Sequence, residues 1–180
     1  MSGRLQTIAV LAMLMLGSGS DALGQAIAAG KNEVETDFTF SSSTFSGVDG
    51  LRTTEYSWRL TYGRLVSNRI AIGPVFAIRS EERTDTTPFN VGGLARFYFG
   101  DRDSGPIPFV EASSTRAFNQ GFDQNYTDLQ ISGGLLFPMG ASGGRFRIAP
   151  YYYRAFYDAQ QTGFSYFHSF GVSWSVGLLF

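Results

Sequence analysis

The chain of 180 residues is 43% hydrophobic and 16% aromatic, carries a formal net charge of −1 and contains no cysteine. The nearly neutral charge gives no electrostatic basis for nucleic-acid binding, and the lack of cysteine excludes disulfides and thiolate chemistry. No apolar run approaches the ~20 residues that a membrane-spanning helix needs. The hydrophobic residues are dispersed in alternation instead, which is typical of strands with one apolar face.

The N-terminal residues have the three-part pattern of a secretory signal peptide. Arg4 supplies a positive start, Ile8–Leu16 is an apolar core too short to cross a bilayer, and residues 17–24 are mainly small or polar. Small residues precede two possible cleavage points, after Gly24 and after Ala28. We therefore expect a signal peptide at residues 1–24, cleaved between residues 24 and 29, and an exported domain at residues 25–180.

From about residue 33 the sequence divides into eight segments with a period of two, which predicts eight β-strands. The last segment shows the pattern most clearly: it reads FGVSWSVGLLF, with a large apolar residue at every second position from Phe170 to Phe180. The expected strands are Glu33–Phe40, Thr54–Tyr62, Arg69–Arg79, Phe89–Phe99, Ile107–Ser114, Tyr126–Phe137, Arg145–Tyr157 and Phe170–Phe180.

The connections between these strands are expected to alternate in length. Ser67-Asn68, Gly100–Gly105 and Pro138–Gly144 are compact and rich in turn residues. The longer, polar ones are Phe40–Leu51, Ser80–Pro88, Thr115–Asn125 and Asp158–Ser165. Short turns alternating with longer loops are typical of barrels of the bacterial outer membrane, with the turns and both termini on the periplasmic side. The predicted fold is all-β: an eight-stranded antiparallel up-and-down transmembrane barrel.

Arginines within the strands fix which face is turned inward. A one-residue slip of the second or fourth strand would expose Arg59 or Arg96 to lipid and hide Trp58 or Phe97 inside. An arginine at the middle of the bilayer costs roughly 2–4 kcal/mol on the lipid face. We therefore expect the arginines to point into the lumen and the aromatic residues to face lipid.

This orientation collects charges inside the barrel. The expected lumen charge network contains Arg59, Arg96, Glu111, Asp128 and Arg147. Glu33, Glu35 and Asp37 of the first strand are expected beside it. Because side chains fill the interior of an eight-stranded barrel, acidic and basic groups can neutralise one another there. We interpret the network as a static polar core; the alternative is an ion path opened by exchange of salt-bridge partners.

At this point the chain resembles the small eight-stranded outer-membrane barrels of the OmpA/OmpX type. The resemblance rests on the terminal segment WSVGLLF, on VGGLARFYFG (Val91–Gly100), on PIPFVEA (Pro106–Ala112) and on the leader. It implies location in the bacterial outer membrane and contact with the barrel-assembly machinery during biogenesis. The residues that would carry the assembly signal are Trp174, Val176, Leu178 and Phe180.

Catalytic and metal sites are not expected. The single histidine, His168, precedes Ser169, but adjacent side chains on a strand point to opposite faces, so the two cannot form a nucleophile and its base. Asp101–Gly105 lacks the further oxygen ligands of a calcium loop and is expected to be a turn. No cofactor is predicted.

The outer loops are then the candidate sites of specific contact. Phe45 in the first loop and Phe118 and Phe122 in the third are apolar residues within polar segments. Loops on a rigid scaffold commonly carry function. The sequence thus predicts a monomeric outer-membrane protein with a structural or surface-interaction role, in contact with outer-membrane lipid or lipopolysaccharide and without nucleic acid. The alternatives are a narrow pore for small solutes, an outer-membrane lipid hydrolase and a soluble lipocalin-like carrier.

Overall fold

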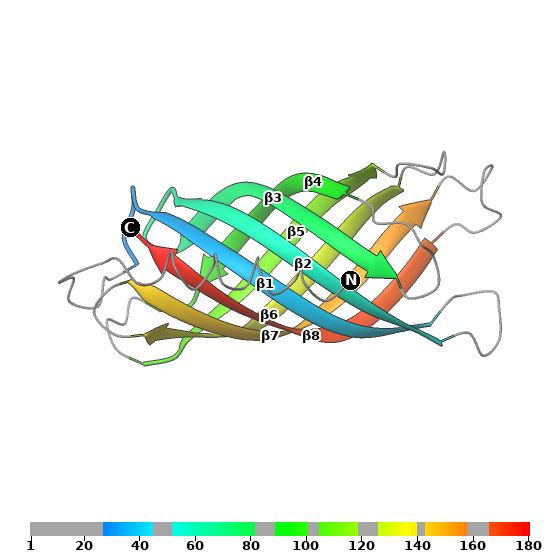
Figure 1. Cartoon of the computed structure of the whole chain (residues 1–180). Helices are drawn as coiled ribbons and strands as arrows, with labels where there is room; N and C mark the ends of the chain where they lie inside the picture. The colour runs from blue at the N-terminus through cyan, green and yellow to red at the C-terminus, as the bar shows by residue number, and fades with distance from the viewer. Residues whose placement is uncertain are drawn as a thin grey trace, which may run out of the picture.

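The computed structural model describes residues 27–44, 52–81, 89–100, 105–118, 126–139, 143–157 and 166–180 (Figure 1). The strands close into one antiparallel barrel in chain order, and β1 pairs with β8, so the sheet has no open edge. Their bounds are β1 Asn32–Thr44, β2 Arg52–Leu65, β3 Ile70–Glu81, β4 Phe89–Tyr98, β5 Ile107–Phe118, β6 Tyr126–Met139, β7 Gly144–Tyr157 and β8 Tyr166–Leu179. No helix within the described ranges is long and apolar enough to cross a membrane.

The predicted fold is confirmed, but several strands are longer than the sequence pattern indicated. β1 continues to Thr44, β5 to Phe118 rather than Ser114, and β8 begins at Tyr166 rather than Phe170. The added residues pair regularly with neighbouring strands, as Ser43 does with Thr53 and Ser169. Most of the residues added to β1 and β5, together with His168 and Ser169 of β8, are polar or small, which weakens the alternation of hydrophobicity, although the backbone ladder continues through them.

The two ends of the barrel differ in their connections. The end that holds Asn32 and Leu179, together with the β2–β3, β4–β5 and β6–β7 connections, is called the turn end below; the opposite end is the loop end. Residues 66–69 and 140–143 are short connections, as predicted, whereas residues 99–106 span as many positions as the connections of the loop end. The expected alternation therefore holds for two of the three turns.

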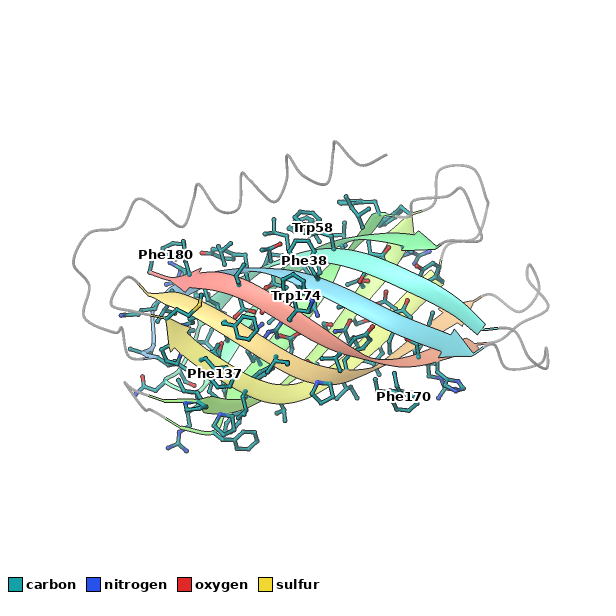
Figure 2. The ribbon with its side chains drawn as sticks, turned by 60° about the horizontal axis from the view of Figure 1, so that its bottom comes forward. Phe38, Trp58, Phe137, Phe170, Trp174 and Phe180 are labelled. Carbon is teal, nitrogen blue, oxygen red and sulfur yellow. The ribbon has the colours of Figure 1, made fainter. Side chains whose placement is uncertain are left out.

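Polarity is inverted relative to a soluble protein. Arg59 and Arg96 are buried in the lumen, whereas Trp174 on the outer face is 47% exposed. Figure 2 shows Trp58, Phe137 and Trp174 on the outside of the sheet, and Phe170 and Phe180 at opposite ends of β8. This arrangement is what hydrocarbon around the barrel requires, and it contradicts the lipocalin-like alternative, which needs an apolar interior.

Aromatic contacts on the lipid face reinforce the β1–β8 seam where the barrel closes. The rings of Phe38 and Trp174, which are paired across the seam, stack with centroids 4.9 Å apart (Figure 2). One strand further along, the indole Nε1 of Trp58 donates a hydrogen bond of 2.7 Å to Oγ1 of Thr36. Both polar groups therefore have a partner on a face where hydrocarbon offers none.

Glycine and proline occur where two ladders of the sheet are interrupted. The β2–β3 ladder is interrupted between the pairs Thr61–Val75 and Arg64–Ile72, where Pro74 has no N–H to donate. At Gly73 the strands approach so closely that a Cβ atom would lie 1.8 Å from the carbonyl oxygen of Tyr62. The β6–β7 ladder has a similar interruption between the pairs Ser132–Tyr151 and Leu135–Ile148, where Pro150 lies opposite Gly133.

The close approach at Gly73 predicts an asymmetry between two neighbouring glycines. We expect Gly73→Ala to lower the free energy of unfolding by more than ~1–3 kcal/mol, the usual cost of overpacking, because its Cβ would meet rigid backbone. Gly93→Ala is the matched control, since its Cβ would lie 3.7 Å from the nearest atom, the carbonyl oxygen of Gly73. Urea unfolding of the refolded barrel measures both; equal stabilities would contradict the described packing.

Candidate functional site: the filled lumen

Glu111 is the centre of an ion-pair network that crosses the lumen. Its carboxylate on β5 accepts hydrogen bonds from Arg59 on β2, Arg96 on β4 and Arg147 on β7. The distances are 2.8 Å to Nη2 of Arg59, 2.8 and 2.6 Å to Nε and Nη2 of Arg96, and 2.9 Å to Nη1 of Arg147. One buried carboxylate thus connects three other strands through the interior.

Arg96 extends the network to the first strand. Its Nη1 donates to Oε1 of Glu33 and Oε1 of Glu35, each at 2.8 Å, and its Nη2 donates to Oε2 of Glu35 at 2.8 Å. The hydroxyl of Tyr98 accepts from Nη1 of Arg96 at 3.0 Å and donates to Oε2 of Glu33 at 2.6 Å. Charge-assisted contacts of this kind are the strongest hydrogen bonds in proteins.

Arg147 links the other half of the network. Its Nη2 donates to Oδ1 of Asp37, its Nε donates to the hydroxyl of Ser175 at 3.0 Å, and the same Nε lies 3.4 Å from Oε2 of Glu35. Arg145, on the same strand, is also buried. Four buried arginines therefore share this part of the lumen with four buried carboxylates, Glu33, Glu35, Asp37 and Glu111.

Small residues beside β1 make room for its carboxylates. Glu33 pairs with Gly63 on β2, where an added Cβ would lie 2.6 Å from Oε1 of Glu33. Glu35 pairs with Gly177 on β8, where a Cβ would lie 2.5 Å from Cγ of Glu35. The glycines on the inner faces of β2 and β8 are therefore required by the volume of the network as well as by the backbone.

An apolar layer closes the lumen on the turn-end side of the network. Phe109 faces the ions, with Cζ of Arg147 and of Arg96 at 5.1 and 5.7 Å from its ring centroid, which is the range of cation–π contacts. The layer consists of Ile27, Leu65, Ala71, Tyr98, Ile107, Phe109, Leu136, Ala149 and Leu179. Ile27 belongs to it although it precedes the first strand, and a chain cleaved after Gly24 would retain it.

Asp128 does not belong to the network, contrary to the grouping expected from the sequence. It lies nearer the loop end, where it accepts hydrogen bonds from the backbone N–H of Thr115 at 3.0 Å, from the Thr115 hydroxyl at 2.8 Å and from Nδ2 of Asn90 at 3.0 Å. The hydroxyl of Tyr153 lies 3.3 Å away. Tyr126, Tyr151 and Tyr153 pack with two alanines around this level of the lumen. The partners described for Asp128 are all uncharged.

The sequence missed these partners for an identifiable reason. The alternation along each strand distinguishes inward from outward positions, but it does not say which inward residues meet across the barrel. That depends on the tilt of the strands and on the register of seven other strands. The inward charges of β1 are expected beside the network, and the structure makes them members of it, as partners of Arg96 and Arg147.

The structure bears differently on the residues predicted for loop contacts and on those predicted for the assembly signal. The prediction that Phe118 lies in a loop is wrong, because β5 continues through Arg116 and ends at Phe118. The side chain of Phe118 is half exposed, and the residue pairs with Phe89 on β4. Phe45 and Phe122 lie outside the described residues. Trp174, Val176, Leu178 and Phe180 all belong to the outer face of the last strand and its end, and their role in assembly stays a prediction.

His168 and Ser169 point to opposite faces, as predicted. Ser169 is buried in the lumen, whereas His168 lies on the outer face beside the rings of Tyr152 and Phe170. Within the described part of the chain no group of three or more His, Cys, Asp or Glu side chains is arranged to hold a metal ion.

The network predicts unequal effects of two isosteric substitutions. Glu111→Gln removes the charge that three arginines share, so we expect it to cost about 3–5 kcal/mol of unfolding free energy, as breaking a buried ion pair does. Asp128→Asn is the matched control and is expected to cost about 1–3 kcal/mol, because its partners are neutral. Urea titration of the refolded barrel checks this, and a larger loss for Asp128→Asn would contradict it.

Comparison with known proteins gives a likeness of fold. No protein-family model matches the chain, and no curated protein sequence matches it. The crystal structure of Neisserial surface protein A matches 83% of this chain and 98% of its own, with 16% identity and a TM-score of 0.66. Two proteins of Pseudomonas aeruginosa also match. The N-terminal β-barrel domain of OprF has 15% identity over 87% of this chain and 100% of its own, with a TM-score of 0.55.

The outer membrane protein OprG has 13% identity over 89% of this chain and 99% of its own, with a TM-score of 0.54. All three have the fold that the sequence resemblance implied. This fold supports the bacterial outer membrane as the location of the protein. In architecture the chain is a small eight-stranded barrel of the outer-membrane type.

Proposed function

We propose that this chain is an integral outer-membrane protein whose barrel is a sealed scaffold, and whose loop end carries out a structural or surface-interaction role. The observation that carries the proposal is the filled lumen. Moving from the loop end to the turn end, it contains the Asp128 cluster with its tyrosines, then the ion-pair network, then the apolar layer around Phe109. A solute would have to displace each of these in turn.

In such a scaffold the connections at the loop end can change in sequence and length without disturbing the strands. The four loop-end connections join strands held by continuous ladders, and loops on rigid scaffolds commonly carry binding functions. Phe89 and Phe118, paired at the ends of β4 and β5, are 45% and 50% exposed at this end. One protein of similar fold is named a surface protein, which agrees with this role. We propose no catalytic role.

A pore is the second candidate, and one feature favours it. Glu111 is shared by three arginines, while Arg96 and Arg147 each have carboxylates on β1 as further partners. A rotation that exchanged these partners would preserve the number of ion pairs while changing the shape of the lumen. In this hypothesis the network is a gate rather than a seal.

Single-channel recording in planar bilayers separates the two candidates. For the sealed scaffold we expect no unit conductance steps from wild-type protein whose insertion is verified by a compact, heat-shifted band on a detergent gel. The double variant Glu111→Ala with Arg96→Ala, which empties the centre of the lumen, is expected to produce brief openings.

Asp128→Asn, which leaves the network intact, serves as the control and is expected to stay silent. Regular unit steps from the wild-type barrel that disappear in the double variant would contradict the sealed scaffold and support the gated pore.

A further inference from the structure

Charge is sorted by face in this barrel. All five acidic side chains that the structure describes, Glu33, Glu35, Asp37, Glu111 and Asp128, are buried in the lumen. Among the arginines whose side chains are described, those on the outer surface are Arg64 and Arg69 near the turn end and Arg116 and Arg154 near the loop end. Among the residues whose side chains the structure describes, the acidic ones thus lie in the lumen and these four arginines on the outer surface.

Arg116 and Arg154 stand on either side of β6. Arg116 on β5 pairs with Thr127, and Arg154 on β7 pairs with Leu129, so the two arginines are separated by two strand spacings and by two residues along β6. With strands ~4.8 Å apart and a rise of ~3.4 Å per residue, their Cα atoms are about 12 Å apart. Two arginine side chains can reach a single lipid headgroup across this distance.

The two arginines also lie at one height in the membrane. In a barrel of tilted strands, positions at equal height shift along the ladder by roughly one residue per strand. When paired residues are followed once around the barrel from Asn32, they return to β1 at Ser42, ten residues nearer the loop end. From β5 to β7 the line of paired residues therefore rises toward the loop end by about two residues, and Arg154 lies two residues below that line. The offset between Arg116 and Arg154 therefore compensates the tilt and places both on one line parallel to the membrane plane.

The surroundings place this line at the boundary between hydrocarbon and headgroups. Phe118 and Phe156 lie two residues nearer the loop end on the same two strands, and both are exposed on the outer face. The guanidinium of Arg154 lies 5.0 Å from the ring centroid of Phe156, so it is directed toward the loop end. Aromatic residues and arginines that reach toward headgroups are typical of this boundary, where an arginine costs only ~0–1 kcal/mol.

On this basis we propose that Arg116 and Arg154 bind the phosphate groups of a phosphorylated glycolipid of the outer leaflet. Arginine donates paired hydrogen bonds that fit phosphate oxygens. Below the two arginines, Leu129 and Ile131 on the outer face of β6 provide apolar surface for acyl chains. The inference rests on the proposed outer-membrane location and adds a ligand class to it.

The test measures binding of lipid A, the phosphorylated glycolipid anchor, to the full refolded barrel. Diphosphoryl lipid A is titrated into detergent-solubilised protein, with dephosphorylated lipid A, phosphatidylglycerol and inorganic phosphate as separate arms. We expect the double variant Arg116→Gln with Arg154→Gln to weaken binding of diphosphoryl lipid A roughly tenfold or more, as the loss of charged hydrogen bonds implies.

Arg64→Gln is the matched control, since Arg64 is an exposed outer-face arginine at the opposite end. We expect it to bind lipid A as the wild type does, and we expect inorganic phosphate not to compete. The site would be overturned if Arg64→Gln weakened lipid A binding as much as the double variant does, or if the double variant bound lipid A with wild-type affinity. It would also be overturned if phosphatidylglycerol bound as tightly as lipid A and depended equally on the two arginines. A wild-type dimer that the double variant dissociates would overturn it as well.

The experiment distinguishes failure of the proposed lipid site from failure of the outer-membrane location. The heat-shifted band is checked for every variant, so loss of lipid binding in a folded barrel counts against the site alone. Failure of the wild-type barrel to insert into any bilayer would count against the outer-membrane location itself.

Discussion

Buried carboxylates and arginines inside a hydrocarbon-surrounded sheet must neutralise one another, and this requirement organises the whole barrel. Glu111 meets it by accepting from three arginines on three different strands, and Arg96 and Arg147 pass the connection on to β1. Removing one member would leave uncompensated charge in a site without bulk water, so the members depend on one another. The ion pairs therefore act across the barrel, while the backbone ladders act only between neighbours.

The same alternation of residues that fills the lumen also produces the lipid face. Moving β2 or β4 by one residue would bury Trp58 or Phe97 in the lumen and expose Arg59 or Arg96 to hydrocarbon. The lumen, which needs polar residues, and the lipid face, which needs apolar ones, thus specify the same strand register. Among the side chains that the structure describes, the charges on the outer face of the strands are arginines near the two ends, where headgroups replace hydrocarbon. Arg116 and Arg154 fit this rule, and their equal height makes them more than isolated boundary residues.

Much of this architecture could be predicted from local patterns, because the alternation within each strand indicates which of its residues face inward and which face outward. The inward positions of Arg59, Arg96 and Arg147 were predicted on that basis. The grouping of inward residues was harder, because tilt and register bring distant strands to one level. For this reason the pattern grouped Asp128 with the ion-pair network, although Asp128 makes no described contact with its arginines. The pattern also placed Phe118 in a loop, because the inward residues of β5 near it are polar or small.

The central claim is that apolar side chains face lipid while charged ones fill the interior of the barrel. The two tryptophans, Trp58 and Trp174, both lie on the outer face, so their fluorescence reports on it directly (Figure 2). In vesicles of lipids brominated along their acyl chains we expect strong quenching of this fluorescence, and little quenching by aqueous iodide. Quenching by iodide with no effect of the brominated lipids would contradict the account.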